Sequence, residues 1–274
     1  MSNVPLIPLA DGHQIPQLGF GTWQVSIEDA HKAVDTALEV GYRHIDTAAI
    51  YGNETGVGTA IAESGLARED LWITTKLWNN QHKTDDARIG IEASLERLGL
   101  DYLDLFLIHW PATMKYGEEY IQAWDALQQF QAEGLVRSIG VSNFHPENLD
   151  RLNGEVPVIN QVEMHPTFNQ APLRAELKSR GIQPEAWSPL GQAKDLSDPV
   201  ITAIADELGF SAAQVIIRWH LQLGNVVIPK SVTPARIAEN FEVFDFELTA
   251  AQMDQVNVLD TGERVGSDPA TAEF

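Results

Sequence analysis

The sequence predicts an α/β protein, a (β/α)8 TIM barrel with a short N-terminal β-hairpin, and two observations carry this prediction. Short apolar runs, many of them β-branched, alternate along the chain with amphipathic helical segments. Runs that are apolar on both faces are typical of strands buried in a parallel sheet. The predicted strands cover residues 17–21, 44–46, 71–76, 103–109, 136–142, 158–163, 182–187 and 225–228. Eight such strands favour a closed barrel over an open sheet.

The N-terminal hairpin is predicted from a turn signal. Asp11-Gly12 lies between the apolar residues 6–9 and 15–18. An Asp-Gly pair between two apolar runs is a strong signal for a tight hairpin.

Helix boundaries are predicted from capping residues. Ser26, with Asp29 three positions on, resembles a capping box, and Gly41 ends the helix that follows. Two more capping boxes, each opening an amphipathic helix, are Ser211-Ala-Ala-Gln214 and Thr249-Ala-Ala-Gln252.

The series of strands and helices runs without a break, which predicts one domain over residues 1–274. No linker, low-complexity run or internal repeat interrupts it. The last segment, residues 261–274, is rich in Gly, Pro and acidic residues. It is either loosely ordered or lies over the mouth of the barrel.

Composition restricts the partners and the setting. The formal charge of -21 repels nucleic acid and anionic lipid at long range, so an anionic ligand needs a local basic pocket. With no cysteine there is no disulfide framework and no thiolate metal site, and we expect no metal. The first residues do not resemble a secretory signal, and no run approaches the roughly 18 apolar residues of a membrane span. We therefore expect a cytoplasmic monomer that binds neither nucleic acid nor membrane.

Four polar groups follow the ends of three consecutive predicted strands. They are Asp46, Tyr51, Lys76 and His109. The carboxyl ends of barrel strands are where catalytic groups collect. Each residue alone has an ordinary structural role available, such as a turn, a packed ring or a buried ion pair. Their common position at strand ends favours a shared chemical role.

These four groups are suited to protonating an oxyanion as it forms. We expect the charged amine of Lys76 to lower the pKa of the Tyr51 phenol from its reference value of about 10. Asp46 would hold that amine in place, and neutral His109 would orient a carbonyl oxygen toward the phenol. This is the protein's share of a carbonyl reduction in which a cofactor supplies the hydride.

A phosphate site is predicted beyond the eighth strand. The glycine fingerprint of a Rossmann nucleotide site is absent, since the third glycine is missing after both Gly19-Phe-Gly21 and Gly56-Val-Gly58. The segment from Lys230 to Arg236 instead opens a helix at Pro234 with a cation on each side. A helix N-terminus between two cations suits a phosphate monoester, although it can also be an ordinary solvated helix start.

Indole rings follow several of the strand ends. Trp23, Trp78 and Trp110 come just after three strands, and Trp187 ends the seventh. Trp side chains are often partly exposed to solvent and offer a flat ring for stacking, although such rings can also be buried in the core. We interpret the group as the wall of a cleft for a carbonyl compound beside a nicotinamide.

Over nearly its whole length the chain resembles the aldo-keto reductases, and within them the bacterial 2,5-diketo-D-gluconic acid reductases. The motifs include Gly19-Phe-Gly-Thr-Trp23, His44-Ile-Asp-Thr-Ala-Ala-Ile-Tyr-Gly-Asn-Glu54, Lys76-Leu-Trp78, Leu107-Ile-His-Trp-Pro111, Gly140-Val-Ser-Asn-Phe144, Asn160-Gln-Val-Glu163 and Trp187-Ser-Pro-Leu-Gly191. The resemblance implies a catalytic tetrad of Asp46, Tyr51, Lys76 and His109, with Tyr51 as the acid.

The resemblance also implies NADPH as cofactor, with each part of the cofactor assigned to its own residues. Ser142, Asn143 and Gln161 would hold the carboxamide, and Trp187 would stack on the nicotinamide. The other cofactor residues implied are Gly21, Thr22, Trp23, Asp46, Ser188, Leu190, Gly191, Lys230, Ser231, Val232, Arg236, Glu239 and Asn240. The substrate residues implied are Trp23, Ile50, Tyr51, Trp78, His109 and Trp110.

Two departures from the family pattern bear on cofactor exchange. Trp187 stands where many relatives have tyrosine, and only about seven residues separate Gly191 from Pro199. That is too few for the long loop that covers the cofactor in vertebrate aldose reductases, so we expect quicker cofactor exchange. The loop after His109 and the C-terminal tail are also short, so we expect an open pocket.

Several functions stay open at this stage. A small polar ketone or aldehyde is the expected substrate, with 2,5-diketo-D-gluconate or methylglyoxal as the named candidates. Lys76 at a strand end could instead form a Schiff base, as in barrel aldolases, but Tyr51 and the segment from Lys230 to Arg236 would then need separate explanations. A non-catalytic, reductase-like binding or structural protein is the other alternative.

Overall fold

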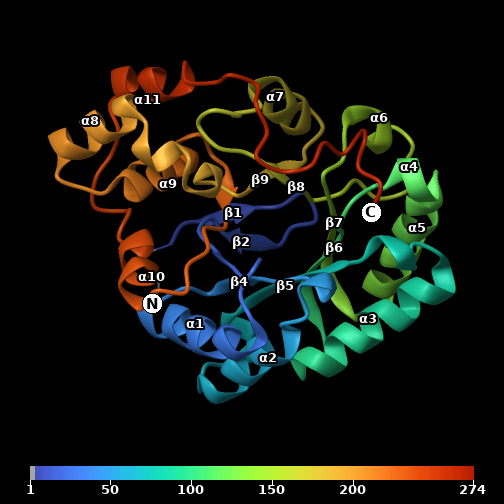
Figure 1. Ribbon diagram of the computed structural model, residues 1–274. Coiled ribbons are helices and arrows are strands. Elements are labelled where there is room, and N and C mark those ends of the chain that lie inside the picture. Colours follow the sequence, from blue (N-terminus) through green and yellow to red (C-terminus); the bar gives the residue numbers. More distant parts are fainter. Residues whose placement is uncertain (1–3) are drawn as a thin grey trace.

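A computed structural model describes residues 4–274 and shows eight parallel strands in one sheet (Figure 1). The strands follow one another in chain order from β3 to β10. They are β3 (Phe20–Gly21), β4 (His44–Asp46), β5 (Trp72–Leu77), β6 (Leu103–Ile108), β7 (Val136–Ser142), β8 (Ile159–Glu163), β9 (Gln183–Trp187) and β10 (Val226–Val227). Each predicted strand is therefore present, most of them within one residue of the predicted bounds.

The sheet closes on itself, which confirms the barrel. Leu18, just before β3, forms a parallel bridge with Val227 of β10. The Gly19 amide donates to the Val227 carbonyl at 2.9 Å, and the Val227 amide donates to the Gln17 carbonyl at 2.9 Å. Both strands at this closure are shorter than predicted, because only part of each apolar run pairs regularly with its neighbours.

Helices surround the sheet on its outer side (Figure 1). They are α1 (Ile27–Val40), α2 (Glu54–Glu63), α3 (Thr84–Leu98), α4 (Thr113–Tyr116), α5 (Glu119–Ala132), α6 (Pro146–Leu149), α7 (Ala171–Ser179), α8 (Pro199–Leu208), α9 (Ala212–Gln222), α10 (Pro234–Phe241) and α11 (Ala250–Asn257). The predicted caps are confirmed. Ser26 accepts from the Asp29 amide, Gly41 ends α1 with φ 127°, and capping boxes open α9 and α11.

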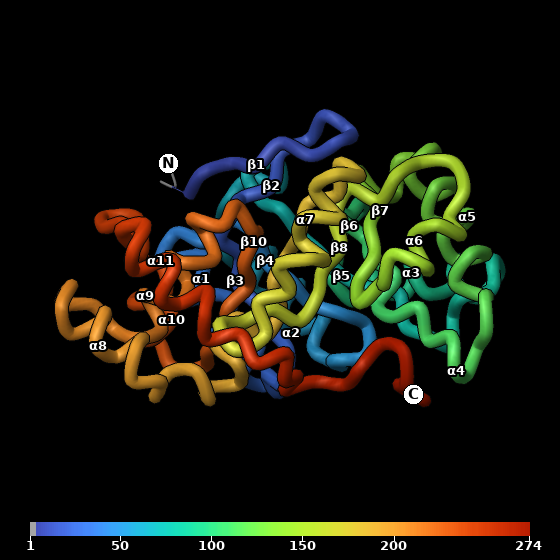
Figure 2. The backbone as a smooth tube through the Cα atoms, turned by 90° about the horizontal axis from the view of Figure 1, so that it is seen from above, coloured from blue at the N-terminus to red at the C-terminus, as the bar shows by residue number. Residues whose placement is uncertain are grey.

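The predicted hairpin is formed by β1 (Leu6–Pro8) and β2 (Gln14–Pro16). Leu9 and Ile15 pack with Trp72 and Leu105, inside the barrel near the beginnings of its strands. Figure 2 shows the hairpin at one end of the barrel and the C-terminal segment at the opposite end. The hairpin therefore closes one end, and a ligand cleft has to lie at the other.

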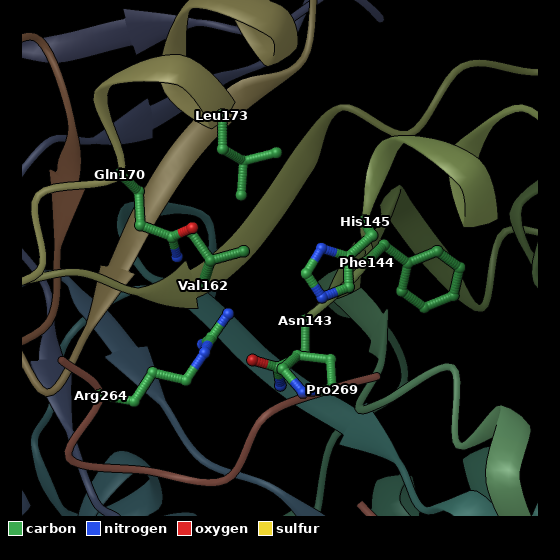
Figure 3. A pocket seen from close by; sticks show the side chains of 8 residues that line it. All are labelled: Asn143, Phe144, His145, Val162, Gln170, Leu173, Arg264 and Pro269. Carbon is green, nitrogen blue, oxygen red and sulfur yellow. The ribbon is translucent and has the colours of Figure 1, made fainter. Parts of the chain in front are cut away.

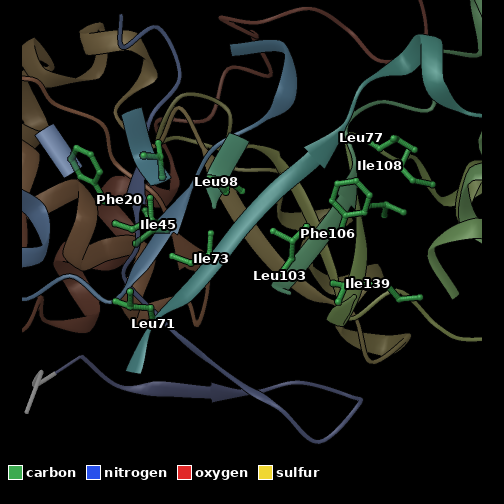
Figure 4. Close-up of a cluster of buried hydrophobic side chains, with 14 of the residues drawn as sticks. Phe20, Ile45, Leu71, Ile73, Leu77, Leu98, Leu103, Phe106, Ile108 and Ile139 are labelled. Atoms are coloured by element: carbon green, nitrogen blue, oxygen red, sulfur yellow. The ribbon is translucent and has the colours of Figure 1, made fainter. Parts of the chain in front are cut away.

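Apolar side chains between the strands and the helices form the main core (Figure 4). Ile45 and Ile73, on the neighbouring strands β4 and β5, are fully buried there. Leu98 from α3 and Phe106 from β6 belong to the same cluster. This packing fixes the strands and, with them, the side chains at their carboxyl ends.

No single helix within residues 4–274 is long and apolar enough to span a membrane. The pair α8 and α9 meets the length and composition together, but the two helices are bent by 94°.

Candidate active site

A cleft of about 1340 Å³ lies at the carboxyl ends of the strands. A second, much smaller hollow of about 10 Å³ lies beside it, where Arg264 and Pro269 of the C-terminal segment face Asn143 and Val162 (Figure 3). That volume holds about one water molecule. The large cleft is therefore the candidate site for an organic ligand.

Asp46 and Lys76 form a buried ion pair beneath the cleft. The Lys76 ammonium donates to Asp46 Oδ1 at 2.6 Å and to the Thr47 carbonyl at 2.9 Å, and its side chain is fully buried. Burial alone would lower the pKa of Lys76, but Asp46 and Tyr51 outweigh it and raise the pKa above its ordinary value. The amine is therefore a fixed positive charge.

Tyr51 lies beside this amine at the end of η1 (Ala49–Tyr51). The Lys76 Nζ atom is 5.3 Å from the centroid of the Tyr51 ring, which is half-buried because it lines the cleft. Burial raises the pKa of Tyr51 to about 12, because the attraction of Lys76 only partly offsets the desolvation of the phenolate, and Asp46 adds to the rise. The prediction that Lys76 brings this pKa below 10 is therefore wrong for the protein without ligands. The phenol is a protonated donor at neutral pH.

His109 completes the group from the end of β6. Its ring centroid is 5.6 Å from that of Tyr51 and 5.2 Å from that of Trp78. Burial lowers the pKa of His109 well below its ordinary value, and the charge of Lys76 lowers it further. The imidazole is therefore neutral, as the sequence predicts, and its buried Nδ1 has no hydrogen-bond partner among the described residues.

A network of amides and one indole lies next to the ion pair. Gln161 Nε2 donates to Asp46 Oδ2 at 2.8 Å, and Ser142 Oγ donates to the Gln161 carbonyl at 2.7 Å. Asn143, which has φ 65°, accepts from Trp187 Nε1 at 2.9 Å through its Oδ1 and donates to the His109 carbonyl at 3.0 Å. These bonds fix the Trp187 ring as a half-buried flat wall of the cleft.

At the other end of the cleft lies the N-terminus of α10. The helix begins with Pro234 after the cap position Thr233, as predicted. Lys230 and Arg236 both line the cleft and are exposed. Neither forms an ion pair with any residue in the range 4–274. In so acidic a protein, two unpaired cations beside a helix N-terminus are a ready anion site.

Aromatic rings surround the opposite, Tyr51 end of the cleft. Trp78 is stacked with Phe274 at a centroid distance of 6.0 Å, and Trp110 meets the same ring edge-on at 5.0 Å. Trp23 is 39% exposed on the cleft wall. Flat apolar walls around Tyr51 and His109 leave room for a small carbonyl compound.

The C-terminal segment lies over the cleft, which decides between the two predicted alternatives for it. The amides of Val265 and Gly266 donate to the Glu163 carboxylate, and Gln192 donates to the Val265 carbonyl at 3.4 Å. Residues 265–267 and Phe274 line the cleft, so the segment forms part of its wall.

Glu163 itself is held by a buried histidine. The two nitrogens of His165 bond Glu163 Oε1 at 3.2 Å and Asp195 Oδ2 at 3.0 Å. Asp195 lies in η5 (Asp195–Ser197), within the short loop after β9. His165 therefore connects Glu163, which holds the C-terminal segment, to Asp195 in the loop after β9.

The sequence and the fold are similar to those of known proteins. Residues 17–261 match the model of the aldo/keto reductase family. The chain is 52% identical over 273 residues to an aldo-keto reductase of Mycolicibacterium smegmatis and 50% identical over 274 residues to the methylglyoxal reductase DkgA of Escherichia coli, with 98% of each chain covered in both pairs. A crystal structure of a Gox0644 mutant in complex with NADPH matches with TM-score 0.95 and 42% identity, and all of both chains is covered.

The chain belongs to the aldo/keto reductase family. The predicted resemblance is thereby confirmed, as is the barrel fold.

Most of the site residues predicted for this aldo/keto reductase meet in the one cleft. Those that line it are Gly21, Trp23, Asp46, Ile50, Tyr51, Trp78, His109, Trp110, Ser142, Asn143, Gln161, Trp187, Ser188, Leu190, Lys230, Ser231, Arg236, Glu239 and Asn240. Four others do not line it. Lys76 lies buried behind Asp46, Thr22 is buried and donates to the Asp46 carbonyl, Gly191 is buried behind the wall, and Val232 is exposed outside.

Several residues of the cleft were not predicted from the sequence. These are Gln24, Pro189, Gln192, Ala193, Leu196, Ser211, Ala212, Ala213, Ile228, Val265, Gly266, Ser267 and Phe274. The capping box at Ser211 marks a helix start that reaches the cleft and was a usable signal. The position of the C-terminal segment had no local signal, because it depends on Glu163.

Proposed function

We propose that this aldo/keto reductase uses NADPH to reduce a small polar ketone or aldehyde to an alcohol. One observation carries the proposal: a phenol, a neutral imidazole and a buried ammonium–carboxylate pair share one cleft with two unpaired cations at its far end. The first group is suited to a carbonyl oxygen and the second to a phosphate.

The described residues suit the cofactor. Lys230, Ser231 and Arg236 would take the 2′-phosphate, since they surround the start of α10. Asn143 and Gln161 would hold the carboxamide against the Trp187 ring. Bound there, NADPH would supply the hydride for the carbonyl carbon.

The chain's own groups would supply the proton. Tyr51 gives its hydroxyl proton to the carbonyl oxygen as negative charge develops there, and neutral His109 orients that oxygen. The charge of Lys76 stabilises the phenolate that remains, and Asp46 keeps that charge in place. Tyr51 then takes a proton back from solvent through the open cleft.

A neutral carbonyl compound such as methylglyoxal suits the site best. Among the described residues that line the cleft, only Lys230 and Arg236 carry a full positive charge, and both lie at the α10 end. The aromatic end therefore has no cation for a substrate carboxylate. The methylglyoxal reductase DkgA, at 50% identity, agrees with this choice.

A sugar acid such as 2,5-diketo-D-gluconate is the second candidate, reduced to a 2-keto-gulonate-type product. The volume of about 1340 Å³ leaves room for a six-carbon chain beside the cofactor. The single-domain extent, the cytoplasmic location, the monomeric state and the lack of nucleic-acid and membrane partners remain predictions from the sequence.

The test is steady-state NADPH oxidation with a panel of carbonyl compounds, for the wild type and for Tyr51→Phe. Losing a positioned acid should lower turnover by about 10² to 10⁴ while NADPH binding stays nearly unchanged. Tyr102→Phe is the matched control, since Tyr102 stacks against Arg68 and Arg137 away from the cleft. A Tyr51→Phe enzyme with near-normal turnover would show that another group donates the proton.

A further inference from the structure

One buried carboxyl next to the site has no part in the mechanism above. Glu185 lies in the middle of β9, and its side chain is fully buried inside the barrel. Its Oε2 accepts from Gln161 Nε2 at 3.1 Å, while its Oε1 has no hydrogen-bond partner among the described residues. An ionised carboxyl buried without a cation of its own costs stability, so Glu185 is a candidate for a functional role.

The bond to Gln161 connects Glu185 to the catalytic pair. Gln161 and Glu185 are direct register partners on the neighbouring strands β8 and β9. The same Gln161 nitrogen donates to Asp46 Oδ2 at 2.8 Å, and Asp46 Oδ1 accepts from Lys76 at 2.6 Å. Both amide protons of Gln161 are therefore used, and its Oε1 is left for a ligand in the cleft that it lines.

The orientation of this amide is fixed by its partners. Asp46 is held as an acceptor by the Lys76 ammonium, so only the nitrogen of Gln161 can face it. Glu185 Oε2 accepts a hydrogen bond from the second N–H of that nitrogen. Without this second acceptor, the amide can rotate away from the geometry that presents Oε1 to the cleft.

The charge of Glu185 matters as much as its hydrogen bond. The charged or titratable groups that face it are Asp46 and His44 from β4 and Lys76 from β5. His44 Nε2 is 3.7 Å from Glu185 Oε1, but burial lowers the pKa of His44 to about 3, so the ring brings no charge. An ionised Glu185 would therefore be a second negative charge beside a single ammonium.

Glu185 changes its charge near neutral pH. Burial raises the pKa of the Glu185 carboxyl to about 8, and the charge of Asp46 raises it further, against the opposing effects of Gln161 and Lys76. The carboxyl is therefore neutral at pH 7 and ionised at pH 9. The pKa of Tyr51, at about 12, lies well above this range.

We propose that Glu185 is a positioning residue of the reaction, which fixes the Gln161 amide and whose proton keeps the Asp46–Lys76 pair able to stabilise the Tyr51 phenolate. The inference rests on the proposed NADPH-dependent reduction. When Glu185 loses its proton, the added negative charge opposes formation of the phenolate, and the proton transfer from Tyr51 slows.

The test compares Glu185→Gln and Glu185→Leu with the wild type. The near-isosteric Gln variant keeps an acceptor for Gln161 but cannot titrate. The wild-type turnover number should fall about tenfold between pH 7 and pH 9, as a single ionisation near pH 8 requires. In Glu185→Gln the same change should be less than twofold.

Glu54→Gln is the control, because Glu54 is an equally buried carboxyl that bonds Thr75 and Arg97 and does not line the cleft. Its turnover number should fall between pH 7 and pH 9 as much as that of the wild type.

Cofactor binding tests the positioning directly. Quenching of tryptophan fluorescence by NADPH at pH 7 should give a dissociation constant within twofold of wild type for Glu185→Gln. Glu185→Leu should bind NADPH about tenfold more weakly, because Gln161 loses an acceptor.

Two outcomes overturn the inference: a wild-type pH profile of turnover in Glu185→Gln, or unchanged NADPH binding in a folded Glu185→Leu. Should the Leu variant not fold, the pH profile of Glu185→Gln decides alone. If the wild type reduces none of the carbonyl compounds in the panel, the proposed function is overturned, and this inference with it.

Discussion

Replacing Arg236 by alanine should raise the Michaelis constant for NADPH and leave that for NADH nearly unchanged. Arg236 occupies the third position of α10, after Pro234 and Ala235, and lines the cleft with Lys230. The two cofactors differ only in the 2′-phosphate. A residue that binds this group should affect one cofactor and leave the other nearly unchanged.

The size of the effect follows from the exposure of the site. A charge-assisted hydrogen bond contributes about 1.5 to 3 kcal/mol, or roughly ten- to a hundredfold in affinity. Arg236 is exposed, so solvent and salt screen its interaction with the phosphate. We therefore expect the lower end, about a tenfold rise in the Michaelis constant for NADPH and less than twofold for NADH. Arg236→Lys should fall between wild type and alanine, because it keeps the charge but not the paired donors.

The assay is steady-state kinetics with each cofactor at a fixed concentration of one carbonyl substrate. Arg151→Ala is the matched control. It removes the same charge at an exposed arginine that pairs with Glu118 at 2.8 Å and does not line the cleft. Equal losses for NADPH and NADH in Arg236→Ala would refute the assignment of the phosphate site, and so would an unchanged constant for NADPH.

Two further predictions concern the substrate and the C-terminal segment. Catalytic efficiency should be higher for methylglyoxal than for 2,5-diketo-D-gluconate, and lowest for a bulky steroid ketone; a tenfold advantage of the steroid would contradict the picture of a small polar substrate. Glu163→Ala should lower the melting temperature by about 2 to 12 °C, since a buried acceptor contributes about 1 to 3 kcal/mol and a chain of this size loses roughly 2 to 4 °C per kcal/mol. Burial opposes the charge on His165, but hydrogen bonds to Asp195 and Glu163 raise the pKa of His165 above its ordinary value. The stability that charged His165 contributes to the fold is therefore present below about pH 6.5 and is lost as pH rises through the raised pKa. Burial would raise the pKa of Glu163 and of Asp195, but their hydrogen bonds, above all those to His165, together outweigh it and lower both pKa values. The stability that these two carboxylates contribute is therefore lost only as pH falls below about 4. The difference in melting temperature should therefore be larger at pH 5.5 than at pH 9, and a difference that grows with pH would contradict this account.

Local patterns were sufficient to predict most of the fold. Apolar runs and capping residues act within a few positions, so the strands and the starts of α1, α9 and α11 could be located from the sequence. The four groups around Tyr51 could be grouped because parallel strands bring their carboxyl ends together. The short loop after Gly191 was also visible in the sequence. That the C-terminal segment covers part of the cleft was left undecided.

What could not be predicted depends on contacts between distant parts of the chain. The position of the C-terminal segment is set by Glu163, about a hundred residues earlier. The raised pKa of Tyr51 is the balance of burial against Lys76, and a sequence shows the cation but not the burial. The position of Glu185 next to the site could not be predicted for the same reason. It stands in an apolar strand pattern, and only the register of β8 with β9 places it against Gln161.

The charge distribution explains how one cleft can bind an anionic cofactor and still disfavour an anionic substrate. The net charge of -21 repels both at long range, but this field is screened beyond about 8 Å at physiological salt. At contact range the cofactor phosphate would meet Lys230 and Arg236, which form no ion pair with any of residues 4–274. A substrate carboxylate at the other end meets the rings of Trp78, Trp110 and Phe274 instead. It would lose its hydration there without gaining a cation, a loss that a neutral carbonyl compound does not suffer. The indole walls and the charge pattern, which are independent features of the sequence, thus favour the same class of substrate.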